Sequence, residues 1–308
     1  MMGVLNHLST LLLLSLLPPA LSHVVVKFSD VPQCKTFFLE GTTPNLTGVL
    51  VGGTVQNQNR YKPICQLYNN IYRFATLYDT INRIPVFSAY TFTGDGGIRP
   101  SQSWMMEPQL EDIKDQRDMK VNNTAVTHQA VNKDYNNRSL HRGHLFPCSH
   151  APDNDTKKST STLTNAVPRY QNFNQGRWRI MEGKVRDALV KNCNDTNNRT
   201  KAYVVTGAVP SKNNTLNNRV NIPYLMWTAF CCYNNTKNWT VGAYWGENTN
   251  GSGSILNLET LGKLEAKLNQ SYNGTVKVFH DNCPRNITVQ QVNTRTREET
   301  ESECVEMS

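Results

Sequence analysis

The pattern of apolar and polar positions predicts more strands than helices along this chain of 308 residues. Short runs rich in β-branched and aromatic residues either alternate with polar positions or are continuously apolar, which is typical of strands. Residues 23–60 show no such regularity. The predicted strands are residues 84–92, 203–209, 224–233, 241–245 and 276–279.

Two helices are predicted where apolar residues recur at spacings of three and four. The clearer one begins near Asn174 and continues to about Lys191, and the second covers residues 256–268. The apolar stripe of the first helix consists of Trp178, Met181, Val185 and Leu189. Strands and helices in this order indicate an α+β fold.

The N-terminus predicts a secretory signal peptide. Residues 8–17 form a short apolar run, and Ala20-Leu21-Ser22 supplies small residues for cleavage before His23. A membrane anchor is the alternative, but the run is short for a helix that needs roughly 20 apolar residues. We therefore expect a secreted protein without stable membrane association. The expected division is a signal peptide (1–22), one domain (23–290) and an acidic tail (291–308).

Cysteines and glycosylation motifs point to the same compartment. The chain has 8 cysteines, an even number that favours disulfides in a secreted protein, although 105 pairings are possible for eight cysteines. There are also 13 Asn-x-Ser/Thr sequons, and several of them are expected to be glycosylated if they lie in exposed loops.

The net charge of +8 suggests an anionic partner. The C-terminal stretch is acidic, so the rest of the chain is more basic than this total. A basic surface is what phosphate binding requires, but a basic glycoprotein with dispersed lysines would have the same composition.

Residues 140–186 contain the residue types that phosphodiester hydrolysis needs. His144 can accept a proton near neutral pH, and Asn174 offers a neutral oxygen of the kind that Mg²⁺ binds. In a regular helix, Glu182 and Arg186 would lie roughly 80° and 120° around from Asn174. All three could then face one histidine on a strand.

These residues can be given roles in the reaction. His144 would be the general base for the attacking water, and Asn174 would be the direct ligand of a mostly hydrated Mg²⁺. Glu182 would hold metal-bound waters, while Arg186 and Arg142 would face the phosphate. Each residue alone also has an ordinary explanation, such as a surface ion pair or a helix cap.

Ordered motifs in this region resemble the DNA/RNA non-specific endonuclease family. They are RGH at 142–144, TNAVP at 164–168, and N-Q-G-x-W-x-x-x-E-x-x-x-R at 174–186. The resemblance extends over about residues 65–290. Further segments, including PQCKTFFLEG, RFATLYDTINRIPVFSAYTF and WMMEPQ, are similar to the secreted endonuclease domain-containing 1-like proteins of vertebrates within this family.

The resemblance implies a central antiparallel sheet flanked by helices, with a ββα-metal (His-Me finger) motif at the active site. It implies cleavage of DNA and RNA with little sequence preference, using Mg²⁺ or a similar divalent ion such as Mn²⁺. By position it assigns His144 as general base, Asn174 as metal ligand, Glu182 as partner of metal-bound water and Arg186 as phosphate stabiliser. Arg99 is the nearest candidate for an upstream arginine that contacts substrate.

One position departs from the family pattern, which usually has aspartate where this chain has His141. A histidine there offers different hydrogen bonds and could add positive charge. The alternative function is therefore a weakened nuclease module that binds nucleic acid without efficient cleavage. His141, His144, Cys148 and His150 could instead hold zinc. A purely structural glycoprotein is a third alternative, and the sequence does not indicate the oligomeric state.

Overall fold

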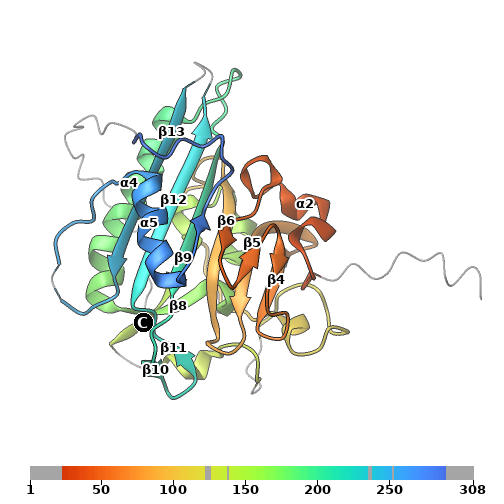
Figure 1. The fold of residues 1–308 in the computed structure, drawn as a ribbon. Coiled ribbons are helices and arrows are strands. Elements are labelled where there is room, and N and C mark those ends of the chain that lie inside the picture. Colours follow the sequence, from red (N-terminus) through yellow and green to blue (C-terminus); the bar gives the residue numbers. More distant parts are fainter. Residues whose placement is uncertain (1–22, 122–125, 137–138, 235–237, 252, 289–308) are drawn as a thin grey trace, which may run out of the picture.

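The computed structural model describes residues 23–121, 126–136, 139–234, 238–251 and 253–288. The expected signal peptide and tail lie outside these residues. The centre is a six-stranded sheet in the order β13-β12-β9-β6-β5-β4, in which all neighbours are antiparallel (Figure 1). Its strands are β4 (Tyr61–Tyr68), β5 (Ile71–Asp79), β6 (Ile84–Phe92), β9 (Ala202–Val209), β12 (Leu225–Tyr233) and β13 (Trp239–Glu247). The α+β class and the central antiparallel sheet are thus confirmed.

Strand β12 is covered on both faces, which explains its continuous apolar sequence. Trp227 and Cys231 pack into one hydrophobic core, and Met226 and Phe230 into a second core on the other face. Because side chains alternate along a strand, a strand between two cores is apolar at nearly every position, and the one buried hydroxyl of β12, on Thr228, lies 2.9 Å from the Thr206 hydroxyl.

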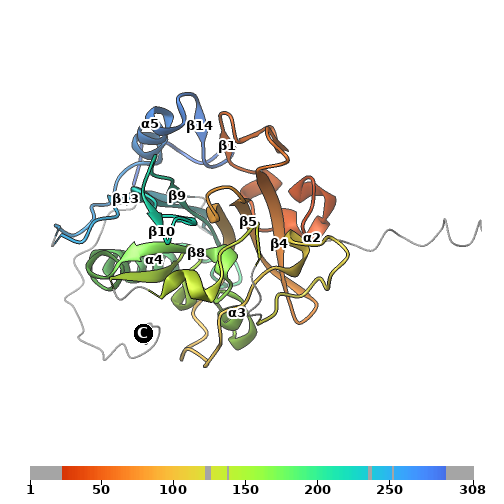
Figure 2. The ribbon, with the colours of Figure 1, turned by 90° about the horizontal axis from the view of Figure 1, so that it is seen from below.

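Helix α5 (Leu261–Tyr272) covers one face of the sheet (Figures 1 and 2). Its buried leucines, among them Leu264 and Leu268, pack into the first core. The Thr260 hydroxyl caps the helix by accepting a hydrogen bond from Lys263 N at 3.2 Å. This side also carries η1 (Phe28–Asp30), α2 (Pro32–Lys35), η2 (Leu39–Gly41) and a small sheet of β14 (Val276–Lys277), β1 (Asn45–Leu46), β2 (Leu50–Val51) and β3 (Thr54–Val55).

Helix α4 (Arg179–Asn192) and the hairpin of β7 (Leu140–His144) and β8 (Ala166–Tyr170) cover the opposite face (Figure 2). The predicted apolar stripe of α4 is buried in the second core. The other short elements are η3 (Pro108–Leu110), η4 (Asn132–Tyr135), η5 (Cys148–His150), α3 (Asn154–Ser159), η6 (Leu163–Asn165), η7 (Phe173–Trp178), β10 (Thr215–Leu216) and β11 (Val220–Asn221).

The structure corrects two sequence-based expectations. Strands β4 and β5 were not predicted, and their buried polar residues explain why: Gln66 donates to Thr164 Oγ1 at 2.9 Å, and the hydroxyls of Thr76 and Ser88 are 3.0 Å apart. The helix predicted from residue 256 begins only at Leu261. The preceding segment is extended, since Glu259 forms an antiparallel bridge with Ala243.

Three disulfides join distant parts of the described chain: Cys34–Cys65, Cys193–Cys232 and Cys231–Cys283. The adjacent Cys231 and Cys232 point to opposite faces of β12, so Cys231–Cys283 lies in the first core, as Cys34–Cys65 does, and Cys193–Cys232 lies in the second. The expectation of disulfides is confirmed, and Cys304 lies outside the described residues. Exposed sequon asparagines are Asn154, Asn198, Asn213, Asn238, Asn250, Asn269, Asn273 and Asn286.

Candidate active site

His144 ends strand β7, where it pairs with Ala166 of β8. It is 7% exposed, and its ring centroid lies 4.9 Å from that of Trp104. Burial lowers the pKa of His144 well below its usual value, and the positive charges of Arg99 and Arg169 lower it further. The imidazole is therefore neutral at neutral pH, as a general base requires. Its Nε2 is buried and has no hydrogen-bond partner among the described residues.

Asn174 lies on an irregular turn before α4. The turn η7 is π-helical, and Gly176 within it has φ −97° and ψ −112°, which is not a helical conformation. The regular helix α4 follows from Arg179. The angular offsets expected for Glu182 and Arg186 were wrong, because they assumed 100° per residue from Asn174 onward. Asn174 itself is partly exposed.

Glu182 projects from the first turn of α4, and its side chain is 16% exposed. Burial raises the pKa of Glu182 to about 7, while the charge of Arg169, the Trp178 indole and the charge of Arg179 act in the opposite direction. Arg169 Nη1 lies 3.9 Å from Glu182 Oε1. This carboxyl group is therefore only partly ionised near pH 7, and a further cation nearby would favour its ionised form.

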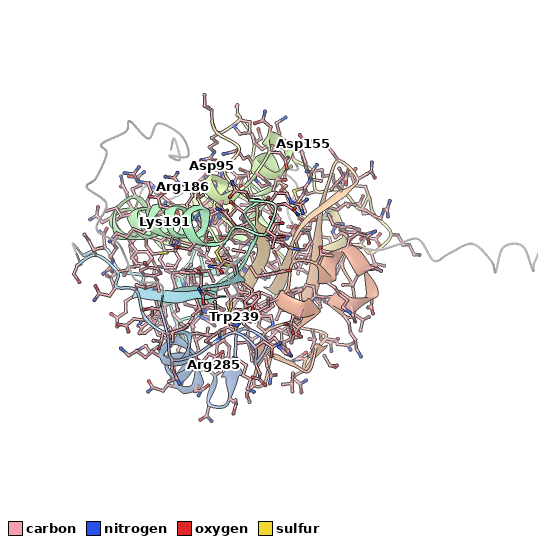
Figure 3. All side chains as sticks on the ribbon, turned by 90° about the horizontal axis from the view of Figure 1, so that it is seen from above. Asp95, Asp155, Arg186, Lys191, Trp239 and Arg285 are labelled. Atoms are coloured by element: carbon pink, nitrogen blue, oxygen red, sulfur yellow. A yellow bond between two sulfur atoms is a disulfide. The ribbon has the colours of Figure 1, made fainter. Side chains whose placement is uncertain are left out.

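Arg186 lies beside acidic side chains. Its Nη1 is 3.8 Å from Asp95 Oδ2, and its Nε donates to Asp187 Oδ1 at 3.2 Å (Figure 3). Asp95 also accepts a hydrogen bond from the buried Lys157 at 3.0 Å. Although Glu182 and Arg186 are one helical turn apart, each has contacts of its own: Glu182 with the hairpin and Arg186 with the loop that follows β6.

Arg142 lies against aromatic rings on the same face of β7 as His144. Its Cζ is 5.2 Å from the ring centroid of Tyr135 and 5.7 Å from that of Trp104. Its Nη2 also donates to the carbonyl oxygen of Asn132 at 3.2 Å. These contacts hold the guanidinium beside the residues that surround the histidine.

His141 lies on the other face of β7, because successive side chains alternate along a strand. It is the register partner of Arg169 on β8. Burial lowers the pKa of His141, and the charge of Arg142 lowers it further. His141 is therefore neutral at neutral pH, and the extra positive charge considered for this position is not expected.

His150 connects the site to the core of the sheet. Its Nε2 lies 2.9 Å from the carbonyl oxygen of Glu182, and its Nδ1 lies 2.8 Å from the Tyr90 hydroxyl. A carbonyl oxygen only accepts, so Nε2 carries the proton and Nδ1 accepts from Tyr90. Both ring nitrogens are engaged, which argues against His150 as a zinc ligand. No three His, Cys, Asp or Glu side chains converge on a metal position within the described segments.

Asn165 anchors the start of β8 under the site. Its Oδ1 accepts from the Ser88 hydroxyl and from Phe146 N, both at 2.9 Å. Its amide donates to the carbonyl oxygens of Phe146 and Thr160. The TNAVP motif gave the position of this asparagine but not its role, which is to join the sheet to the segment that follows His144.

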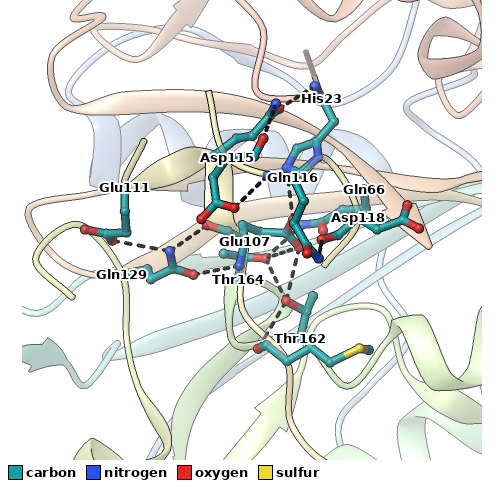
Figure 4. A network of polar contacts seen from close by, with 12 residues as sticks. His23, Gln66, Glu107, Glu111, Asp115, Gln116, Asp118, Gln129, Thr162 and Thr164 are labelled. Carbon is teal, nitrogen blue, oxygen red and sulfur yellow. Dashed lines mark hydrogen bonds and ion pairs between the residues drawn. The ribbon is translucent and has the colours of Figure 1, made fainter. Parts of the chain in front are cut away.

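A second buried polar network adjoins this anchor (Figure 4). Glu107 Oε1 accepts from the hydroxyls of Thr162 and Thr164 at 3.2 and 3.3 Å, and its Oε2 lies 3.0 Å from His23 Nε2. His23 and Glu107 are both fully buried. The beginning of the described chain is thereby fixed to the segment that precedes β8.

Sequence reasoning missed Arg169, Trp104 and the role of His150. Arg169 is 2% exposed and donates through Nη2 to the carbonyl oxygen of His144. Its Cζ lies 5.4 Å from the ring centroid of Trp178. The one sequence signal was a charged residue in an otherwise apolar strand, AVPRY, which by itself also fits an exposed position.

Comparison with known proteins gives the family of the chain. Residues 52–286 match the family model described as DNA/RNA non-specific endonuclease. The chain belongs to this family, as the resemblance of its motifs predicted.

Two curated relatives are both called Endonuclease domain-containing 1 protein. The chain is 33% identical to the one from Homo sapiens over 219 residues, which are 68% of this chain and 41% of the relative. It is 32% identical to the one from Mus musculus over 68% of this chain and 40% of the relative. The chain thus spans about two fifths of the length of these relatives.

A solved structure is similar at a lower level. A chain in the crystal structure of the EndoG/EndoGI complex, a study of the mechanism of EndoG inhibition, matches with a TM-score of 0.48 and 18% identity. The match covers 68% of this chain and 84% of that chain.

No helix in the described part of the present chain has the length and apolar character needed to cross a membrane.

Proposed function

We propose that this chain is a secreted, metal-dependent endonuclease that hydrolyses phosphodiester bonds of DNA and RNA with little sequence preference. Its family supports nucleic acid as the substrate and phosphodiester hydrolysis as the reaction. The observation that carries the proposal is a buried, neutral His144 on a hairpin that Arg169 joins to Glu182 on α4.

In this proposal His144 removes a proton from the attacking water through its neutral imidazole. The guanidinium groups of Arg142 and Arg186 neutralise charge that grows on the phosphoryl oxygens, and they can do so with two hydrogen bonds each. Arg99 belongs to the same basic surface, because its charge already acts on the pKa of His144.

A divalent cation is implied by the family, and the side chains fit a hard cation such as Mg²⁺ or Mn²⁺. The partly exposed amide of Asn174 would be the direct ligand, and the Glu182 carboxylate would hold waters of the ion. A carboxyl group whose pKa is about 7 is readily ionised when a cation binds nearby. When bound, the ion would stabilise negative charge in the transition state.

Secretion and processing are part of the proposal. Three disulfides support an oxidising compartment. We propose that residues 1–22 are a signal peptide, that residues 23–290 form the endonuclease domain, and that residues 291–308 are a tail. Activity against both DNA and RNA and the absence of stable membrane association are parts of the same proposal.

The test is cleavage of supercoiled plasmid by the secreted protein with Mg²⁺, with EDTA, and with the variant His144→Ala. We expect nicking that requires metal, and a rate at least about 100-fold lower for the variant, as for loss of a general base. Circular dichroism and the melting temperature verify that the variant is folded. Binding of plasmid without cleavage, across several divalent ions and pH values, would reject the enzyme in favour of a binding module.

A further inference from the structure

Arg169 is a buried cation that contacts two separate parts of the candidate site. It lies on β8, is 2% exposed, and donates to the main-chain carbonyl of His144 on β7. Its other Nη lies 3.9 Å from Glu182 on α4, and its guanidinium lies over the ring of Trp178. A buried charge is costly unless it is paired and hydrogen-bonded, so this placement requires the contacts on both sides.

Gly143 provides the space that the guanidinium occupies. A Cβ atom built on Gly143 would overlap Arg169 Nε and lie 2.6 Å from Arg169 Cδ. The glycine of the RGH motif is thus explained by the close approach of an arginine from the neighbouring strand. Sequence analysis alone did not connect these two residues.

We propose that Arg169 is a positioning residue which, in the space left by Gly143, holds the main chain of His144 and the carboxylate of Glu182 in a fixed relation. The inference rests on the proposed function, because the relation matters for hydrolysis by these two groups. The side chain of Arg169 is buried on the face of the hairpin opposite to the His144 side chain, because its register partner is His141. Arg169 would therefore support His144 without contacting the substrate.

The geometry requires arginine rather than a cation in general. The planar guanidinium donates through Nη2 to the His144 carbonyl, places Nη1 3.9 Å from the Glu182 carboxylate, and lies with its face over the Trp178 ring. A lysine would bring one compact charge and could satisfy one of these contacts at a time. Lysine should therefore restore activity only in part.

The first experiment compares Arg169→Met and Arg169→Lys with Arg285→Met in single-turnover and steady-state cleavage of an oligonucleotide. Arg285 pairs with Glu265 on the other face of the sheet and serves as the matched control. We expect kcat to fall about 10- to 100-fold for Arg169→Met with KM changed less than about threefold, and an intermediate kcat for Arg169→Lys. Arg285→Met should lower the melting temperature and leave kcat unchanged.

The inference is overturned if Arg169→Met retains more than about half of the wild-type kcat, or if only KM changes. It is also overturned if Arg285→Met lowers kcat as much as Arg169→Met does, since both effects would then follow from lost stability alone.

A second experiment uses Gly143→Ala, which displaces the guanidinium without removing its charge. We expect at least a tenfold loss of kcat in the wild-type background and less than a twofold further loss in the Arg169→Met background, where the space is free. An equal loss of kcat in both backgrounds would mean that Gly143→Ala affects His144 independently of Arg169, and the inference would fail.

Failure of the proposed function can be recognised separately. If the wild-type protein cleaves no substrate, the enzyme proposal falls. Urea unfolding of wild type, Gly143→Ala, Arg169→Met and the double variant then decides the inference. Non-additive effects of Gly143→Ala and Arg169→Met on the free energy of unfolding support the arrangement, and additive effects overturn it.

Discussion

Each face of the central sheet packs a helix glutamate near an arginine, and the two pairs are built differently. On the α5 face, Glu265 accepts hydrogen bonds from Val278 N at 2.9 Å and from Arg285 Nε at 3.1 Å. On the α4 face, Arg169 Nη1 lies 3.9 Å from Glu182, which is beyond hydrogen-bond distance.

The difference separates a structural pair from a candidate functional one. Glu265 has close donors from both the main chain and a side chain, as buried carboxylates usually do. The Arg169 charge acts on Glu182 from a greater distance, which leaves acceptor capacity for a water or for a hydrated ion. Burial raises the pKa of both carboxyl groups, so burial alone does not distinguish them.

The largest expected effect on cleavage comes from removing the negative charge of Glu182. Glu182→Gln should lower the rate of plasmid cleavage about 100-fold or more, because the amide cannot hold waters of a cation as a carboxylate does. Its free energy of unfolding should fall as well, by about 1–3 kcal/mol, because the buried Arg169 loses its partner charge. Initial rates and urea unfolding measure both quantities.

Glu265→Gln is the matched variant. It should keep cleavage within about twofold of wild type and lose about 1–3 kcal/mol of unfolding free energy, because the charge-assisted bonds to Arg285 weaken. If the two variants had the same profile, the distinction between the two pairs would be lost.

The two faces should also differ in their response to acid, through His150 on the α4 face. Burial lowers the pKa of His150 to about 4, despite the favourable contact with the Glu182 carbonyl. The unfolded chain, with a histidine pKa of about 6.5, binds more protons between these values. The contribution of the neutral His150 to the free energy of unfolding is therefore fully present above pH 6.5 and is lost as the pH falls toward 4.

From this histidine alone we expect a loss of about 2 kcal/mol in unfolding free energy between pH 7 and pH 5. His150→Gln retains a donor and an acceptor but does not titrate, so it should lose correspondingly less over this range. Urea unfolding at both pH values provides the comparison. Parallel pH dependence in the two proteins would exclude His150 as the origin.

Sequence patterns predicted those strands that are mostly apolar, even where a single polar residue is buried in them, as Ser88 is in β6 and Thr228 is in β12. Residues 84–92 were predicted with the bounds of β6, and the apolar run of β12 was found because both faces are buried. Strand β4 was missed because Gln66 is buried against Thr164, which lies 98 positions away in the sequence. A local pattern does not reveal a partner at that distance.

The same limit applies to the site. The motifs supplied residues for every proposed role, but the path from Asn174 to Glu182 passes through the non-helical Gly176, which a helical wheel does not anticipate. Arg169 was missed because its burial depends on a space in the neighbouring strand. The motifs therefore supplied the candidate residues of the proposed chemistry, while the contacts that arrange these residues required the fold.

The smallest expected effect concerns the ring that covers His144. Because burial is the main cause of the low pKa of His144, Trp104→Ala should admit water and move this pKa up toward 6.5. The acidic limb of the pH–rate profile would then shift to higher pH, with less than about a tenfold change in rate above pH 8. Trp239→Ala, at an aromatic pair with Tyr233 distant from the hairpin, is the control and should leave the limb in place.

An unchanged limb in Trp104→Ala, together with an increased KM, would assign the tryptophan a different role. Its ring also stacks with Arg142, so loss of the ring would then act on phosphate binding rather than on the base. A shifted limb with unchanged KM would instead locate the effect at His144. The Trp104 indole contacts both His144 and Arg142. The pH profile and KM together therefore decide through which of these two residues the tryptophan affects cleavage.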